Sequence, residues 1–393
     1  SLKIHSGTKR QKPHTLLHCL NMSHNHKATN NPKLLIIHVG ADKCASSSLQ
    51  DALEALDKSH PELQDYQFLK NNLLLKRDDP KEEEKRKYIK SIFKKRCSNT
   101  LIVSNEGLIG ESLPSLGLLC KTAFDDYNFE RAIITMYTRS PASHAISSYH
   151  QWFFRDKKIL ESDIKAAQEI GLNSDLLTPL ERRLIAVYSK KQYRNWNHVA
   201  KNINNQILEF NDRIKIVSKH IPTKEENYPL LSDFLESANV SDNYQHISLP
   251  DFEKRSNDRF SIELTHSLSI LLCENAFSQM FAPGPHELNH FLMALSVAYK
   301  ESQLTFDNNL NDTYTSYRQN LSILSSLLDE LAREGTTKYC EEFNLEPELF
   351  FHPKTNELPP QIESIIKNTS KRDIHKIKAF NQSCIERSSR IYK

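Results

Sequence analysis

Residues 34–50 read LLIIHVGADKCASSSLQ, and this stretch decides the fold. Its first part, Leu34–Val39, is a short apolar run that ends at a glycine, which is typical of a buried parallel strand. Apolar residues then recur at helical spacing over Ser47–Leu56, where Ser47 and Gln50 have the spacing of a capping box. A strand, a tight loop and a helix in this order predict a βα unit.

The same alternation continues along the chain. Lys81–Arg96 is a charged stretch with apolar residues at helical spacing, and Pro141–Phe154 begins with a proline, which favours a helix start. Thr100–Val103 and Arg131–Thr138 are apolar runs that predict two further strands. Strands that alternate with helices indicate an α/β fold in three layers, with a parallel sheet flanked by helices.

The second half of the chain is mainly helical in pattern, from about Leu160 onward. Ile207–Phe210 and Ile214–Val217 are its two strand candidates. The expected helices are Pro179–Lys190, Gln192–Asn202, Leu230–Glu236, Ser261–Ala276, His286–Lys300 and Tyr314–Arg333.

These patterns divide the chain into three parts. Residues 1–32 contain no acidic side chain and predict a mobile basic tail, with a targeting segment as the alternative. Residues 33–300 form the predicted domain, and residues 301–393 form a helical C-terminal extension.

The composition of the 393 residues is that of a globular protein, since 38% are hydrophobic, 26% are charged and the formal net charge is +3. This charge is too small to indicate nucleic-acid binding. No apolar run approaches the ~20 residues of a membrane span. The seven cysteines stand singly without zinc-site spacing. They favour reduced thiols, no metal and a cytoplasmic location, with a removed N-terminal signal or anchor as the alternative.

The loop between the first strand and the first helix has the features of a phosphate site. Backbone N–H groups at a helix start point outward, and the helix dipole favours an anion. The loop is not a Walker A loop, because its lysine does not follow a second glycine directly. An ordinary βα turn is the alternative interpretation. The candidate contacts are Lys43, Cys44, Ala45, Ser46, Ser47 and Ser48.

A second candidate phosphate contact follows the strand Arg131–Thr138. Arg139 directly follows this strand, Pro141 comes two residues later, and Ser147 lies further along the next predicted helix. A guanidinium group binds phosphate with charged, often bidentate hydrogen bonds, and a serine adds one more donor. For an arginine at a strand end, the alternative is an ion pair at the surface.

A carboxylate follows the strand between these two motifs. Glu106 would stand at the carboxyl edge of the sheet, where open α/β folds bind their ligands. A carboxylate there can act as a general base. The alternative is a structural role, in a hydrogen bond or a helix cap.

The two motifs together resemble those of PAPS-dependent sulfotransferases. That family has K-x-G-[ST]-[ST] after a strand, or K-x-A-S in some carbohydrate sulfotransferases, and the second form is similar to Lys43–Ser46. Its second motif is R-x-P, with a serine eight residues after the arginine, as in Arg139, Pro141 and Ser147. A weaker resemblance is the basic segment Lys254–Asp258, where Arg255 either contacts the nucleotide or belongs to a solvated cluster.

The resemblance implies a P-loop-like sulfotransferase fold and transfer of a sulfuryl group from PAPS, leaving PAP, without a metal. Lys43 would stabilise the charge on the departing phosphate, and Glu106 would take the acceptor's proton. The acceptor would be a hydroxyl or amine of a small molecule or glycan, most naturally a carbohydrate or glycoconjugate. His144 and His150 are the next candidates for the base.

Two other function classes fit the same pattern. One is a P-loop nucleotide kinase or NTPase, although the expected lysine position and the magnesium-binding aspartate are missing. The other is a non-catalytic module that binds nucleotide or glycan.

Overall fold

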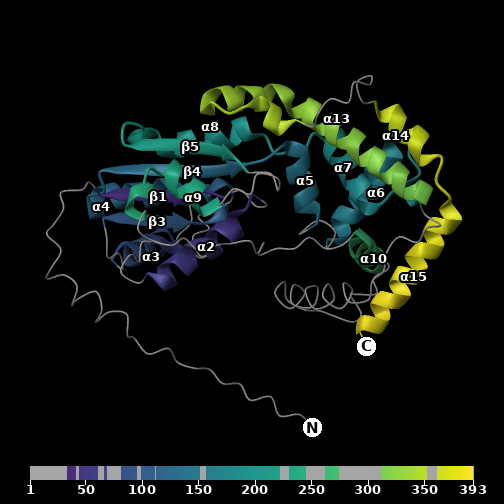
Figure 1. Cartoon of the computed structure of the whole chain (residues 1–393), viewed down its shortest axis with the longest axis horizontal. Helices are drawn as coiled ribbons and strands as arrows, with labels where there is room; N and C mark the ends of the chain where they lie inside the picture. The colour runs from purple at the N-terminus through teal and green to yellow at the C-terminus, as the bar shows by residue number, and fades with distance from the viewer. Residues whose placement is uncertain are drawn as a thin grey trace, which may run out of the picture.

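The computed structural model describes residues 33–40, 44–60, 66–68, 81–94, 99–110, 112–150, 156–221, 230–244, 262–273, 311–351 and 361–392 (Figure 1). At its centre is a five-stranded sheet in the order β2-β3-β1-β4-β5, in which every neighbouring pair is parallel. The predicted parallel sheet is therefore confirmed. The strands are β1 (Leu34–His38), β2 (Tyr66–Phe68), β3 (Thr100–Ser104), β4 (Arg131–Thr138) and β5 (Ile214–His220).

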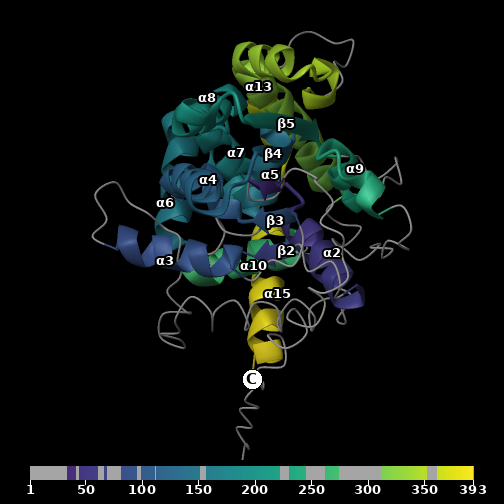
Figure 2. The same ribbon diagram turned by 90° about the vertical axis from the view of Figure 1, so that its left-hand side faces the viewer.

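Helices cover both faces of this sheet, as Figure 2 shows. On one face lie α2 (Ser46–Ser59) and α9 (Leu230–Ser237), which contact each other. On the other face lie α3 (Glu82–Phe93), α4 (Leu113–Tyr127) and α8 (Trp196–Ile207). All five β1 side chains are buried in the resulting core, which explains why this strand is continuously apolar up to His38.

A helical region adjoins the carboxyl ends of the strands (Figure 1). It has a hydrophobic core of its own, to which residues such as Leu184, Leu268 and Leu324 contribute. Its helices are α5 (Pro141–Tyr149), α6 (Lys157–Glu169), α7 (Pro179–Ser189), α10 (Ile262–Cys273), α13 (Asn311–Phe343), α14 (Ile362–Thr369) and α15 (Ile374–Tyr392).

Helix α13 belongs to both cores. Leu324 and Leu328 pack in the helical core, whereas Tyr339 and Cys340 are buried in the core of the sheet. The hydroxyl of Tyr339 also hydrogen-bonds that of Ser218 on β5. The sequence predicts that this helix ends at Arg333. In the structure it continues to Phe343, because Tyr339 and Cys340 pack against the sheet. The proposed domain boundaries after residues 32 and 300 lie outside the described residues.

Several sequence-based boundaries were wrong. Ile207–Phe210 is not a strand but the end of α8 and a 3-10 helix, because Ile207 and Phe210 face the core together at a helical spacing. The capping box at Ser47 does not form, since α2 begins at Ser46 without a side-chain cap. The sequence did not predict β2, α4, α6, α14 or α15. The expected helix His286–Lys300 lies outside the described residues.

A buried ion pair joins the C-terminal helices to α7. The guanidinium of Arg372, between α14 and α15, donates to both carboxylate oxygens of Glu181 at 2.6 and 2.7 Å. Both side chains are almost completely buried, at 1% and 0% exposure. Asn320 of α13 donates to the same carboxylate at 2.9 Å, and Ser316 accepts from Arg372 at 3.1 Å. Hydrogen bonds therefore join the pair to α7, to α13 and to the connection between α14 and α15.

Candidate functional site

The candidate site lies at the carboxyl edge of the sheet, where β1, β3 and β4 end. His38 closes β1 and is paired in register with Ser104 of β3 and Thr135 of β4. Strand β4 continues beyond Thr135 to Thr138, and Arg139 follows it. Helix α2 starts after β1 on one face of the sheet and α4 follows β3 on the other, so β1 lies where the strand order reverses. Open α/β sheets bind ligands in such a crevice.

The start of α2 has the geometry of an anion site. Ala45 precedes the helix in the left-handed conformation, with φ of 62°, and no side chain of the described residues caps the helix. Its first turn contains no acidic residue. Gly40 lies directly beside the start of α2, since a Cβ on Gly40 would be 1.9 Å from Oγ of Ser46. Only glycine fits so close to the helix start, where backbone N–H groups and the helix dipole favour negative charge.

The predicted loop residues do not all face this site. Cys44 is buried in the core of the sheet, so its backbone alone is available for a ligand. Ser46 is buried and Ser48 is half-buried. Oγ of Ser47 donates to Oε1 of Glu106 at 3.5 Å. Lys43 lies outside the described residues.

Glu106 faces the start of α2 from the neighbouring strand connection. It is the first residue of the 3-10 helix η2 (Glu106–Ile109), which follows β3. The buried side chain of Asn105 caps this helix by accepting from the Gly107 backbone N–H at 2.6 Å. Glu106 is itself half-buried. The structure thus brings the predicted carboxylate to the predicted phosphate loop, through Ser47.

The second predicted pair is also brought together. An Nη atom of Arg139 donates to Oγ of Ser147 at 2.7 Å, from the strand end to the following helix. Two contacts fix the backbone here. Nε1 of Trp196 donates to the Arg139 carbonyl at 2.8 Å, and the side chain of Ser140 caps α5 by accepting from Ser143. Pro141 takes the first position of α5, as expected. The guanidinium is therefore anchored beside one serine hydroxyl at the sheet edge.

Two hydrogen-bonded groups at this edge were not predicted. Ser104 interacts with both His38 and Gln50, at 2.8 and 2.9 Å. On the other side of β4, the buried carboxylate of Asp233 accepts from Tyr137 and from Lys219, both at 2.6 Å. The one signal for the first group was a histidine that ends an apolar strand. The second joins β4 to β5 and α9, which lie 82 and 96 residues later in sequence, and no local pattern reveals this contact.

The remaining candidates have these positions. His144 and His150 are both buried on the helix after Arg139, where their rings pack edge-on against Trp196 and Tyr149. Arg255 lies outside the described residues. Within the described ranges, no three histidine, cysteine or carboxylate side chains gather as metal ligands. The five cysteines that the structure describes form no disulfide with one another.

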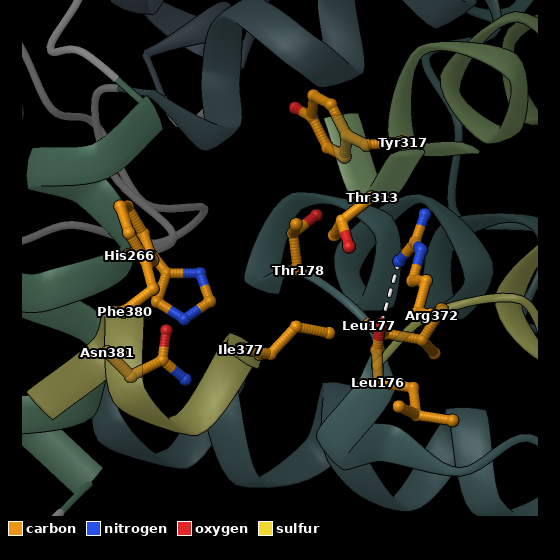
Figure 3. A pocket seen from close by; sticks show the side chains of 10 residues that line it. All are labelled: Leu176, Leu177, Thr178, His266, Thr313, Tyr317, Arg372, Ile377, Phe380 and Asn381. Carbon is orange, nitrogen blue, oxygen red and sulfur yellow. Dashed lines mark hydrogen bonds between the residues drawn. The ribbon is translucent and has the colours of Figure 1, made fainter. Parts of the chain in front are cut away.

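A small, mostly apolar pocket lies away from this edge, in the helical region (Figure 3). His266 of α10 lines it opposite residues of α15, and Arg372 lines it next to its hydrogen bond with the Leu176 carbonyl. No residue of the sheet edge contributes to it. The lining residues are Leu176, Leu177, Thr178, His266, Thr313, Tyr317, Arg372, Ile377, Phe380 and Asn381.

Two buried histidines make stability depend on pH. Burial lowers the pKa of His38 to about 4 and that of His266 to about 3. The unfolded chain has a histidine pKa near 6.5 and binds the proton more readily, so stability falls as pH drops below about 6.5. Each histidine should cost about 2 kcal/mol of unfolding free energy between pH 7 and pH 5. Asp163 has the opposite effect on stability. Burial raises its pKa to about 6, so the folded protein binds this proton more readily than the unfolded chain and gains stability as pH falls from 7 to 5.

Urea unfolding at pH 7 and pH 5 measures this effect. We expect His266→Gln to lose about 2 kcal/mol less than the wild type over this interval. His198→Gln, at an exposed position, is the matched control and should follow the wild type. Equal pH dependence in all three proteins would contradict the buried neutral state of His266.

The fold and this edge define an α/β protein whose parallel sheet, flanked by helices, carries hydrogen-bonded polar groups at its carboxyl end. No family model matches the chain, and no curated protein or solved structure is significantly similar to it. Among the described helices, none is both long and apolar enough to cross a membrane.

Proposed function

We propose that this protein is a PAPS-dependent sulfotransferase with the P-loop-like sulfotransferase fold. One observation carries the proposal: two elements suited to phosphate, the uncapped start of α2 and the Arg139–Ser147 pair, follow the adjacent strands β1 and β4 at one sheet edge. PAPS carries an anionic group at each end of its ribose. A ligand with two separate phosphates therefore matches this arrangement better than one with a single phosphate chain.

The two elements take different parts of the cofactor. The start of α2, with Ser46, Ser47 and Ser48, binds the 5′-phosphosulfate, and Lys43 of the same loop adds positive charge. Arg139 and Ser147 bind the 3′-phosphate. Ala45, in the left-handed conformation, turns the backbone into the helix. Arg255 stays a sequence-based candidate for a further contact.

The reaction is an in-line transfer. The acceptor's oxygen or nitrogen attacks the sulfur and forms a new S–O or S–N bond, while the bond from sulfur to the phosphate oxygen breaks and its electron pair leaves with PAP. The start of α2 stabilises the charge that builds on the departing phosphate. Glu106 takes the acceptor's proton, since it lies at the same helix start, 3.5 Å from Ser47. The proposed acceptor is a hydroxyl or amine of a carbohydrate or glycoconjugate.

Replacing Arg139 with alanine tests the 3′-phosphate contact. A charge-assisted hydrogen bond contributes about 1.5–3 kcal/mol, so affinity for PAP should fall about 10- to 150-fold. Titration calorimetry with purified full-length protein measures it. The matched control is Arg131→Ala, because Arg131 is exposed at the opposite end of the same strand and should leave affinity unchanged.

Unchanged PAP affinity in a folded Arg139→Ala protein would remove the 3′-phosphate assignment. Equal losses in Arg139→Ala and Arg131→Ala would show a general charge effect and no site. Magnesium-dependent binding of ATP, in preference to PAP, would favour a nucleotide kinase or NTPase. PAP binding without turnover on any acceptor would favour a non-catalytic module.

A further inference from the structure

The last residue of β1 carries an imidazole that the proposed reaction does not yet use. His38 is fully buried at the strand end that leads into the phosphate loop. Its Nδ1 lies 2.8 Å from Oγ of Ser104, and Gln50 of α2 donates to the same oxygen at 2.9 Å. Three side chains from β1, β3 and α2 thus form one hydrogen-bonded chain.

The hydrogen bonds in this chain favour one tautomer of His38. The amide nitrogen of Gln50 only donates, so Ser104 accepts from it and keeps its own hydroxyl proton to give. Nδ1 of His38 is the acceptor in reach of that proton. Burial lowers the pKa of His38 to about 4, so the ring is neutral near pH 7. A neutral ring that accepts at Nδ1 carries its proton on Nε2.

The ring of His38 approaches the start of α2 with its carbon Cε1, which is bonded to Nε2. This carbon is 3.0 Å from the position of a Cβ on Gly40, and that position is 1.9 Å from Oγ of Ser46. The histidine ring and the helix start therefore meet at one glycine. Nε2 is buried and has no hydrogen-bond partner among the described residues. Buried donors of this kind are rare in native proteins unless a ligand or water satisfies them.

We propose that Nε2–H of His38 donates a hydrogen bond to the anion bound at the start of α2, so that His38 is an anion-binding residue. This inference rests on the proposed function, in which that anion is the 5′-phosphosulfate of PAPS. The hydrogen bond comes from the strand side of the loop and complements the backbone donors of the helix. Ser104 and Gln50 act as positioning residues, since they hold the ring in the donating tautomer.

Two substitutions separate the donor from the bulk of the ring. The amide nitrogen of glutamine reaches about as far as Nε2 of histidine, whereas that of asparagine reaches only as far as Nδ1. His38→Gln should keep PAP affinity close to the wild type. His38→Asn should weaken it about 10- to 150-fold, as expected for loss of a hydrogen bond to a charged group. Thermal melting without ligand reports whether both variants remain folded.

The tautomer is measured directly in the wild type, which needs no variant to fold. Nitrogen NMR of the full chain labelled at histidine should show His38 protonated at Nε2 before ligand is added. Saturation with PAP or PAPS should then shift the Nε2–H resonance. Gln50→Leu should shift the tautomer balance toward Nδ1–H, because Ser104 is then no longer committed as an acceptor.

A proton on Nδ1 in the free protein, or an Nε2–H signal that PAP and PAPS leave unmoved, would overturn the inference. Wild-type affinity in a folded His38→Asn protein would do the same. If the wild type still binds PAP in any of these cases, the proposed function stands while the role of His38 falls. If the wild type binds neither PAP nor PAPS, the proposed function fails, and the inference fails with it.

Discussion

Glu106→Gln is expected to lower the turnover number about 10²- to 10⁴-fold, the usual cost of losing a positioned general base. Glutamine keeps the shape of the side chain and its contact with Ser47, which lies 3.5 Å from the carboxylate. Affinity for PAP should change little, because the base acts on the acceptor. Transfer from radiolabelled PAPS to carbohydrate acceptors measures turnover, and calorimetry measures PAP affinity. Glu130→Gln is the control, since Glu130 is exposed at the far end of the sheet.

The rival interpretation makes Glu106 structural, through its contact with Ser47. In that case the variant would melt at a lower temperature, and activity would fall only in proportion to the folded fraction. A stable variant with near-normal turnover would exclude Glu106 as the base. His144 and His150 would be the next residues to replace, although both are buried.

Arg372→Met is expected to lower the free energy of unfolding by about 3–5 kcal/mol, because it leaves the carboxylate of Glu181 buried and without its charged partner. The control is Lys338→Met, which breaks an exposed ion pair with Glu334 on α13. Exposed pairs of this kind contribute little to stability, so this variant should unfold close to the wild type. Urea unfolding at pH 7 measures both changes.

The double variant Glu181→Leu/Arg372→Met tests the same ion pair in a second way. It should be more stable than Arg372→Met alone, because no unpaired charge is left in the interior. An Arg372→Met protein as stable as the wild type would contradict the idea that this pair fastens the C-terminal helices to α7. A double variant less stable than Arg372→Met would contradict the desolvation argument.

The sheet could be predicted from the sequence because three of its strands are buried along nearly their whole length. β1, β3 and β4 are continuous apolar runs, and parallel strands covered on both faces need such runs. The strand β2 was not predicted, because its three residues are too few to show a strand pattern. The Ile207–Phe210 error has a related cause, since two apolar residues three apart satisfy a helix end as well as a short strand.

The candidate site could be predicted where a local motif contains both partners, or where a residue such as Glu106 follows a predicted strand at the sheet edge. Arg139 and Ser147 lie on a strand end and the next helix, so their spacing alone brings them together. His38, Ser104 and Gln50 meet only because β1 and β3 pair in a particular register. Glu181 and Arg372 are 191 residues apart in sequence, and their contact depends on the packing of helices that no local pattern specifies.

Comparing PAP with ATP in thermal melting tests the central claim most directly. The two proposed phosphate elements predict that PAP, at about 100 times its dissociation constant, adds about 2.7 kcal/mol to the stability of the folded protein and visibly raises its melting temperature. ATP at the same concentration should raise it less, because ATP lacks the 3′-phosphate that Arg139 and Ser147 would bind, and magnesium should not reverse the order. Equal shifts with PAP and ATP, or a shift with magnesium and ATP alone, would contradict the sulfotransferase proposal.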